Sequence, residues 1–533
     1  MKPMKKLQEY FIPYTNEEDF FNMIQEKIVF EVNPDDFRQN IERKIWPLLC
    51  QTSFFIVEDT YTETEWKDMI AEHYIHTKYT TIPTVVRVHL FTANEEIKES
   101  YLGCFTLRKI NNPDIIMSFI YPNWNVLKLD DKEFMDCYLI TAKKRIHIYA
   151  EEIEIQTTPY FVQDGIVTSC AHASMVMLTN FLNLKFGYKR IRVKDINQSY
   201  INREKLFPTK GLLLDQVMEV LTNNGINIEK CGIKTKNTSE EEQKDIEEQV
   251  KSYLRSGFPV MLGIENHLVL IVGFKENTDE FLFLDDSGAL IHSINKEKYE
   301  NQDTEYDSFI SICSWKYIFK TEKNDDLVQL LLPMHERIYS DCEDVSYRCS
   351  ILERNIGLDE DTESTVYKIE NKRFFIVDNV VCKKFVNENI MDREFSEELL
   401  NEFICQEQPH YLWCYEFEYS GQIYIIFINT TYNIESDGNN IYINKDNEPF
   451  HIEKHFQTMF KVKTQKYGES PMFNKKREVK KTLDKSTGEK VRSRAPMIPK
   501  TDVEEALLIT KVERNNDIPK KKSSKNKGKG REH

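Results

Sequence analysis

The stretch TSCAHASMVML, residues 168–178, places one cysteine and one histidine at the start of a long apolar run. Apolar residues continue to Leu184 on all sides of a helical pattern, which predicts a buried helix. Thr168 or Ser169 can supply the oxygen of its N-cap. Cys170 then lies in the first turn, where backbone N–H groups without helical partners and the helix dipole favour a thiolate. The stretch therefore allows two interpretations, a structural thiol in the core and a nucleophile.

His172 does not supply the base that a nucleophilic Cys170 needs. Residues two positions apart on a helix point to different faces, so we expect His172 to be a structural histidine with its polar atoms satisfied. A cysteine alone in an apolar run is most often an inert core residue. The nucleophile interpretation therefore requires a base from a distant part of the chain.

A candidate base opens a predicted strand further along the chain. Residues 255–290 predict three successive strands, at 260–264, 267–274 and 281–284. His267 begins the second of them. Both faces of that strand are apolar, so we expect it to be central in its sheet and the imidazole to be close to buried. A buried imidazole needs a hydrogen-bonding partner.

Two adjacent aspartates are candidates for that partner. Asp285 follows the third strand and lies directly across from His267 if the turn is centred near Glu276. A longer turn shifts the pairing by a residue or two, because sequence alone does not fix strand register. Asp286 is therefore the alternative partner.

Three segments together resemble the papain-like cysteine peptidases, and more closely the bacterial branch that includes the bacteriocin leader peptidases. These segments are residues 159–178, 211–226 and 254–288. The resemblance covers about 155–320, and four positions follow the family order: Gln163, Cys170, His267 and Asp285. Gln163 lies one position further from Cys170 than is usual in the family. Ala171 replaces a usual glycine, and Asp286 a usual proline.

The resemblance implies a thiol hydrolase that cleaves a peptide or isopeptide amide through a Cys-His-Asp triad. Cys170 would be the nucleophile, His267 the base, and Asp285 the residue that orients the imidazole. The side-chain amide of Gln163 and the backbone N–H of Cys170 would stabilise the oxyanion. No metal or organic cofactor is implied. The alternatives are a transamidase or acyltransferase that uses the same triad, and a catalytically inactive papain-like binding module.

The whole chain of 533 residues predicts an α+β protein with several globular parts. We expect an N-terminal α+β domain of unknown role at 1–150 and the papain-like peptidase domain, a buried helix packed on an antiparallel sheet, at 155–320. A β-rich domain is expected at 321–460. The last segment, 461–533, has 22 basic and 10 acidic residues and few aromatics, which predicts a disordered tail. A short helix is predicted inside this tail at 501–515.

The charge and the cysteines of the sequence indicate which partners and which cellular compartment to expect. Residues 1–460 carry 49 basic and 77 acidic residues, so nucleic acid is not expected as the main partner of this part. The basic tail is instead expected to contact an anionic partner or the acidic body. The eleven scattered cysteines are typical of a reduced intracellular protein. No signal peptide and no apolar run of about 18 residues is present, so we expect a cytoplasmic protein without a membrane span, acting on a protein or peptide substrate.

Overall fold

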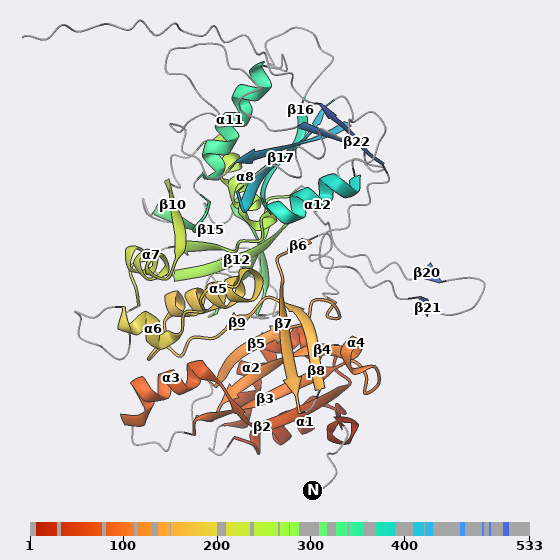
Figure 1. Cartoon of the computed structure of the whole chain (residues 1–533). Coiled ribbons are helices and arrows are strands. Elements are labelled where there is room, and N and C mark those ends of the chain that lie inside the picture. The colour runs from red at the N-terminus through yellow and green to blue at the C-terminus, as the bar shows by residue number, and fades with distance from the viewer. Residues whose placement is uncertain are drawn as a thin grey trace, which may run out of the picture. The chain divides into compact units, whose positions relative to one another are not determined.

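The computed structural model divides into two compact units (Figure 1), which are described one at a time: Met1–Asp341 with Phe473–Met497, and Cys342–Met472 with Ile498–His533. It describes the following residues: 7–28, 33–76, 82–110, 116–128, 137–149, 151–199, 209, 211–234, 239–264, 267–276, 278–286, 309–316, 327–338, 340–355, 369–389, 409–419, 422–429, 459–463, 482–483, 490–491 and 505–510. The α+β class predicted from the sequence is confirmed, because both units combine helices with antiparallel sheets.

The first unit begins with an antiparallel sheet of order β1-β2-β3-β4-β5-β9. Its strands are β1 (Ile12–Pro13), β2 (Phe54–Thr62), β3 (Thr84–Phe91), β4 (Tyr101–Arg108), β5 (Met117–Pro122) and β9 (Tyr160–Phe161). The accompanying helices are η1 (Leu7–Tyr10), α1 (Glu17–Gln25), α2 (Pro34–Leu49), α3 (Thr64–Glu72), η2 (Tyr74–His76) and α4 (Ile97–Ser100). Strand β9 immediately precedes the loop that leads to Cys170, so the N-terminal sheet holds the start of that loop.

A two-stranded hairpin lies between β5 and β9 in the chain and pairs with no strand of this sheet in the described ladders. It consists of β7 (Ala142–Ile148) and β8 (Glu151–Thr157), and it turns at Tyr149, whose φ is 51°. The short strand β6 (Cys137–Leu139), just before the hairpin, pairs with the central sheet instead.

The central sheet has the order β10-β15-β11-β12-β13-β14, and β6 pairs with β12. Its remaining strands are β10 (Ile226–Lys234), β11 (Val260–Ile264), β12 (His267–Lys275), β13 (Glu280–Leu284), β14 (Ser311–Ser314) and β15 (Leu327–His335). The three strands predicted from the sequence within 255–290 are confirmed to within one residue at each end. The turn at 265–266 lies outside the described residues. A side chain at Gly273 would collide with the Tyr138 carbonyl oxygen, which is why glycine is needed where β6 meets β12.

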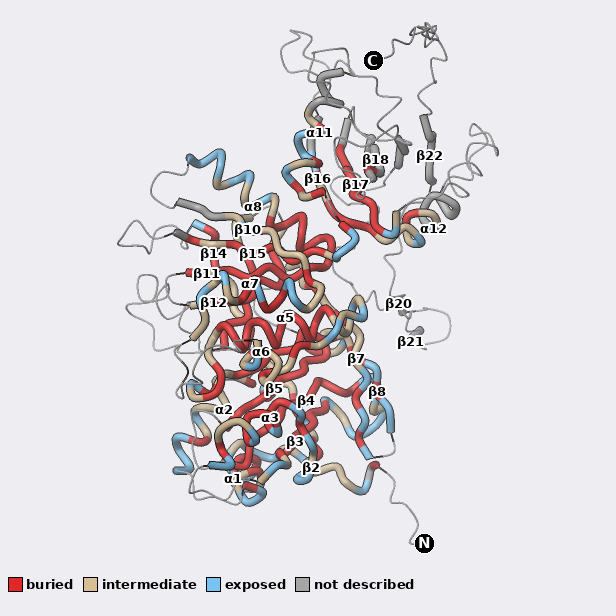
Figure 2. Tube along the Cα trace, turned by 60° about the vertical axis from the view of Figure 1, so that its left-hand side comes forward, coloured by how far each residue is buried: buried red, intermediate tan, exposed pale blue. Residues whose placement is uncertain are grey.

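One buried helix, α5 (Cys170–Phe186), contacts β12 of the central sheet as well as β7 and β9. Every residue from Ala171 to Leu182 is buried, which confirms the helix predicted from the apolar run (Figure 2). Its C-terminal end is Gly187, in a left-handed conformation with φ of 76°. The other helices of this part are α6 (Val193–Gln198), α7 (Leu214–Asn223) and α8 (Glu240–Arg255). A helix apolar all round can be stable in water only when it is covered on all sides, and here it is.

The second unit is a smaller α+β assembly. Its antiparallel sheet has the order β16-β17-β18-β19-β22, and its helices are α11 (Cys342–Asn355) and α12 (Asn379–Asn389). The strands are β16 (Ile369–Asp378), β17 (Tyr411–Tyr419), β18 (Gln422–Asn429), β19 (Met459–Lys463) and β22 (Glu505–Thr510). A buried pair, Arg373 with Glu416, connects β16 to β17.

Most of the predicted tail, 461–533, lies outside the described residues. The described parts are strand segments, which include β20 (Thr482–Leu483) paired with β21 (Lys490–Val491), and β22 paired with β19. The helix predicted at 501–515 is therefore wrong at 505–510. An isolated helix of this length is marginal in water, and pairing with β19 satisfies the backbone N–H and C=O groups instead. The predicted boundaries at 150, 320 and 460 remain predictions, although β15 lies beyond residue 320 and joins the central sheet.

Candidate active site

Cys170 is the first residue of α5, and Ser169 is its N-cap with extended backbone angles. The Ser169 carbonyl accepts the Ala173 N–H at 3.0 Å, so the helical hydrogen bonding starts at the N-cap. Cys170 is partly exposed, in contrast to the residues that follow it. The structure therefore presents this thiol at the open end of a covered helix, where the helix dipole stabilises negative charge.

His267 is the first residue of β12, and the side chains of Cys170 and His267 are hydrogen-bonded to each other. The imidazole is mostly buried, with a side-chain exposure of 20%. One turn along α5 from Cys170, the Ser174 hydroxyl donates to the Leu268 carbonyl at 2.8 Å. This bond joins α5 to β12 at the residue next to His267. It therefore fixes the separation of the helix that carries Cys170 and the strand that carries His267.

Asp285 is the aspartate that contacts His267, and Asp286 is not. Asp285 Oδ1 lies 2.7 Å from His267 Nε2, which leaves Nδ1 for the thiol of Cys170. The last β12–β13 pair is Leu270 with Leu284, so a continued ladder would place Asp285 opposite Val269. The pairing is therefore shifted by two positions from the one in which Asp285 lies directly across from His267, which is within the shift of a residue or two that the sequence left open. The two side chains still meet, because diagonal neighbours on one face of a sheet are within reach of long side chains.

The pKa of His267 is raised to about 10. Burial acts in the opposite direction and would lower it, because a buried imidazolium loses hydration. The hydrogen bonds to Asp285 and Cys170, and the negative charges of Asp285 and Asp286, outweigh burial. The site therefore favours an imidazolium at neutral pH, which is the state that can stabilise a neighbouring thiolate.

Asp286 is almost completely buried, at 1% exposure, and no other residue in the described part of the chain forms a hydrogen bond with its carboxylate oxygens. Burial, followed by the charge of Asp285, raises the pKa of Asp286 to about 7. His267 and Lys44 act in the opposite direction. A buried carboxyl without partners is more stable in the neutral form. This residue therefore adds a titratable group beside the His267–Asp285 pair.

Two residues from the N-terminal part of the chain donate hydrogen bonds to the backbone carbonyls of the two aspartates. The Lys44 ammonium of α2 donates to the Asp286 carbonyl at 3.0 Å. The Tyr160 hydroxyl of β9 donates to the Asp285 carbonyl at 2.8 Å. Sequence reasoning missed both residues, because no local pattern connects Lys44 or Tyr160 with two aspartates that lie more than a hundred residues away in the chain.

The prediction that His172 is structural is confirmed. Its Nδ1 accepts the Ser169 N–H at 3.2 Å, and its Nε2 lies 2.9 Å from Asn197 Oδ1. His172 is fully buried, and burial lowers its pKa to about 4. A neutral imidazole that uses both nitrogens in this way holds the start of α5 and is not available as a base.

Gln163 lies in the loop between β9 and α5 and is partly exposed. The next residue, Asp164, is buried and accepts the N–H groups of residues 166–168. Sequence reasoning missed Asp164, although an aspartate followed by glycine is a recognised signal for a tight turn. These hydrogen bonds therefore fix the backbone of the loop between Gln163 and Cys170.

One set of side chains in the described part of the chain has the geometry to hold a metal ion. A ligand atom from each of His267, Asp285 and Asp286 lies within 4.8 Å of the others. His267 Nε2 and Asp285 Oδ1 are already hydrogen-bonded to each other at 2.7 Å. A proton shared in that bond explains the same arrangement, so we assign no metal to it.

Comparison with known proteins places the likeness in the same part of the chain. Residues 155–314 match the model of the family described as "Peptidase_C39 like family". This match supports a cysteine peptidase of the papain-like kind for that segment, and it does not distinguish the bacteriocin-leader branch that the sequence resembles. No curated protein matches the chain.

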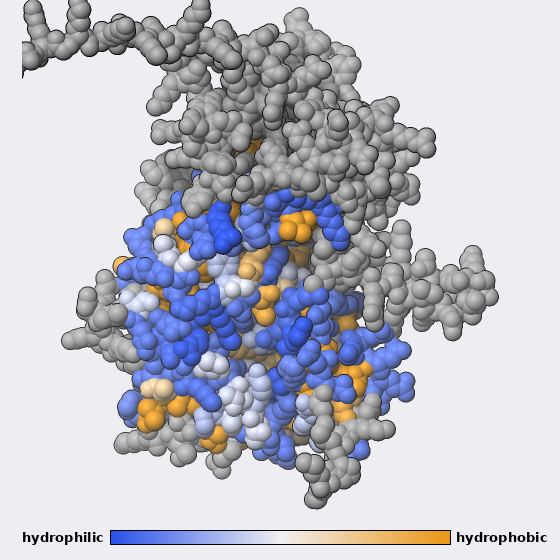
Figure 3. Space-filling view, in the orientation of Figure 1, coloured by the Kyte–Doolittle hydropathy of each residue, from blue (hydrophilic) through white to orange (hydrophobic). Residues whose placement is uncertain are grey.

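Among solved structures, the chain is similar to UfSP from C. elegans at 18% sequence identity and a TM-score of 0.24. The similar region covers 37% of this chain and 34% of that one, so this chain spans about a third of the relative's length. None of the described helices is long and apolar enough to cross a membrane. The described surface in Figure 3 is largely hydrophilic, with scattered apolar residues.

Proposed function

We propose that the segment 155–314 is a cysteine peptidase that cleaves a peptide or isopeptide bond, with Cys170 as nucleophile. The observation that carries the proposal is the chain of hydrogen bonds from Cys170 to His267 to Asp285, in which the second bond is 2.7 Å long. A nucleophile, a base and a residue that orients the base are the elements of this chemistry. The family match to 155–314 supports the same reaction class.

In the first step the Cys170 thiolate attacks the carbonyl carbon of the substrate amide. A carbon–sulfur bond forms, and the carbonyl oxygen takes up negative charge. The side-chain amide of Gln163 and the backbone N–H of Cys170 stabilise that charge. The His267 imidazolium then gives its proton to the amide nitrogen as the carbon–nitrogen bond breaks. A thioester on Cys170 and a free amine result.

In the second step water attacks the thioester. The imidazole of His267 takes a proton from the water, and the thiolate of Cys170 leaves. Asp285 holds the imidazole through Nε2, which leaves Nδ1 to carry the proton that is exchanged in both steps. An amine in place of water would give transamidation with the same residues, so the choice of acceptor is tested by the products.

The alternative of an inactive binding module requires an occluded Cys170 or a His267 turned away from it. The partial exposure of Cys170 and its hydrogen bond to His267 favour the enzyme. We propose that the protein acts in the cytoplasm on a protein or peptide substrate. The scattered cysteines of the sequence support a reducing compartment. We further propose that the basic tail contacts an anionic partner or the acidic body of the same chain.

The test compares the full chain with Cys170→Ala on a library of proteome-derived peptides, with new termini read by mass spectrometry. Cys231→Ala, which removes another partly exposed thiol, is the matched control. We expect cleavage by the wild type and by Cys231→Ala, and none by Cys170→Ala. Cleavage that persists in Cys170→Ala would refute the proposed function.

A further inference from the structure

The loop between Gln163 and Cys170 is organised by a single carboxylate. Asp164 Oδ1 accepts the backbone N–H groups of Ile166, Val167 and Thr168 at 3.0, 2.9 and 2.7 Å, and the Thr168 hydroxyl at 2.9 Å. The Thr168 hydroxyl oxygen in turn accepts the Asp164 N–H at 2.9 Å. Asp164 is 4% exposed and Thr168 is fully buried. Hydrogen bonds to a charged acceptor away from water are among the stronger ones in proteins.

The other oxygen of Asp164 is held by the N-terminal part of the chain. The Tyr74 hydroxyl, from η2, donates to Asp164 Oδ2 at 2.8 Å. Tyr74 is 4% exposed. Burial and the charge of Asp164 raise the pKa of Tyr74, so its hydroxyl stays protonated and remains a donor. Both carboxylate oxygens are thus engaged, one by the loop and one from outside it.

Two backbone bonds complete the loop. The Gly165 N–H donates to the Thr168 carbonyl at 3.0 Å, and Gly165 has a φ of 68° that favours glycine. The Thr209 N–H donates to the Ile166 carbonyl at 2.8 Å.

We propose that Asp164, held by Tyr74, is a positioning residue that fixes this loop so that the Gln163 side chain and the Cys170 backbone N–H meet at one oxyanion. This inference rests on the proposed function, because the oxyanion forms only if Cys170 attacks a carbonyl. Asp164 directly follows Gln163 and binds the segment that leads into α5, so its carboxylate connects the two ends of the loop. The N-terminal part of the chain is then required for catalysis, through Tyr74.

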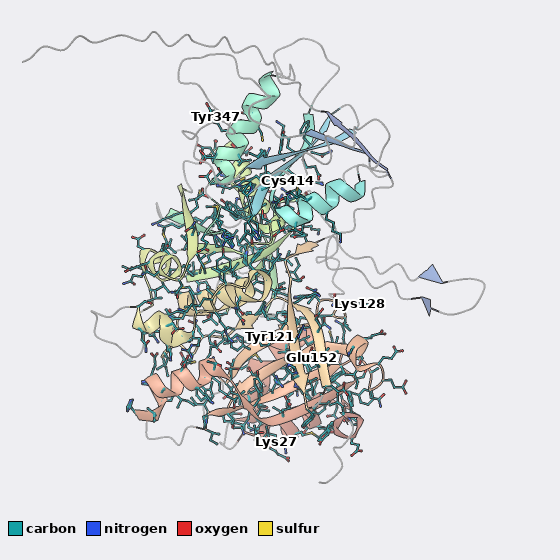
Figure 4. The ribbon with its side chains drawn as sticks, in the orientation of Figure 1. Lys27, Tyr121, Lys128, Glu152, Tyr347 and Cys414 are labelled. Carbon is teal, nitrogen blue, oxygen red and sulfur yellow. The ribbon has the colours of Figure 1, made fainter. Side chains whose placement is uncertain are left out.

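The experiment separates the reactivity of the thiol from the stabilisation of the oxyanion. Alkylation of Cys170 by iodoacetamide needs the thiolate and the imidazolium but forms no oxyanion. Amide cleavage needs both. We compare Asp164→Ala and Tyr74→Phe with Tyr121→Phe, the matched loss of a buried tyrosine hydroxyl, which accepts from Asn180 Nδ2 at 3.3 Å (Figure 4).

We expect Asp164→Ala to lower kcat for amide cleavage by about a hundredfold, the effect of losing one oxyanion donor, and Tyr74→Phe by a smaller factor. KM should stay within about threefold of wild type, since the oxyanion is absent from the ground state. The alkylation rate of Cys170 should also stay within about threefold, since alkylation forms no oxyanion. Hydrogen exchange of the amides at 166–168 should become faster in Asp164→Ala. Tyr121→Phe should cleave like the wild type. Tyr74→Phe tests the inference even if Asp164→Ala does not fold.

Two results would overturn the inference. One is cleavage by Asp164→Ala and Tyr74→Phe at the rate of Tyr121→Phe, which leaves the peptidase itself intact. The other is an equal loss of cleavage and of Cys170 alkylation, which would assign the loop to the nucleophile rather than to the oxyanion. Failure of the proposed function gives a different result, because Cys170→Ala would then cleave as well as the wild type.

Discussion

His267 Nε2 and Asp285 Oδ1 lie 2.7 Å apart, although the two residues are 18 positions apart in the chain and lie on different sides of a strand turn. The contact depends on the β12–β13 ladder, whose register shifts between Ile271 and Gly273. Without that irregularity the pairing of the strand ends would move by one residue, and every side chain beyond it would change face. The hydrogen bond between His267 and Asp285 therefore depends on an irregularity that lies further along the β12–β13 ladder.

Asp285→Asn should shift the pH dependence of cleavage. Activity requires the His267 imidazolium, so it falls as the pH rises through the pKa of His267, which is raised to about 10. Asparagine keeps the hydrogen-bond acceptor but removes the charge, so the alkaline limb of the kcat/KM profile should move down by about 1–3 pH units. The measurement is kcat/KM for amide cleavage across this range.

Asp215→Asn is the control for this measurement, because Asp215 is an exposed carboxylate on α7 with a side-chain exposure of 84%. Its profile should overlie that of the wild type. An alkaline limb that does not move in Asp285→Asn would mean that the charge of Asp285 does not sustain the imidazolium.

Asp286→Asn should change how stability depends on pH. The pKa of Asp286 is about 7 in the folded protein and lies above its ordinary value, so the folded state binds this proton more tightly than the unfolded state. The resulting stabilisation is fully present at acid pH below the ordinary pKa, and it is lost as the pH rises through about 7. Asparagine stays neutral, so the variant should be more stable than the wild type above pH 7 by roughly 1–3 kcal/mol.

Urea unfolding of both proteins across this pH range measures the difference. The gap between Asp286→Asn and wild type should open as the pH rises and close at acid pH, where Asp286 is protonated in both states. Equal stabilities at all pH values would show that the buried carboxyl is neutral throughout or is ionised with a partner.

Removal of residues 511–533 should abolish binding to an anionic probe and leave cleavage unchanged. This segment carries nine basic and three acidic residues and begins after β22, so the truncation keeps the paired strands. Binding of the full chain to a short DNA duplex should weaken steeply with salt, because phosphate contacts release counterions. Replacing Lys520, Lys521 and Lys522 with glutamine should lower the salt slope by about 3. Salt-independent binding, or binding by the truncated chain, would contradict a role for the tail.

Local runs of apolar residues predicted the elements that carry the candidate site. The run after Cys170 predicted a buried helix as far as Leu184, which the structure continues to Phe186, and the run that begins at His267 predicted β12 with its first residue correct. Both predictions rest on local physics, since side-chain direction repeats with the period of the element. Thr168 and Ser169 were both possible caps, and the structure uses Ser169.

The partners of these elements could not be predicted in the same way. The backbone carbonyls of Asp286 and Asp285 accept hydrogen bonds from Lys44 and Tyr160, and the carboxylate of Asp164 accepts one from Tyr74. Each of these contacts joins segments that are distant in the chain and carry no shared pattern. The predicted helix at 501–515 failed for a related reason, because a weak local preference gave way to pairing with β19.

The sequence by itself determined the buried helix, the strands and the chemical groups of the candidate site, because each follows from the order of apolar and polar residues along a short segment. Only the tertiary structure decided that Asp285 rather than Asp286 meets His267, and that Asp164 and Tyr74 shape the loop before Cys170. These contacts depend on strand register and on packing between distant segments, which are set when the whole chain folds.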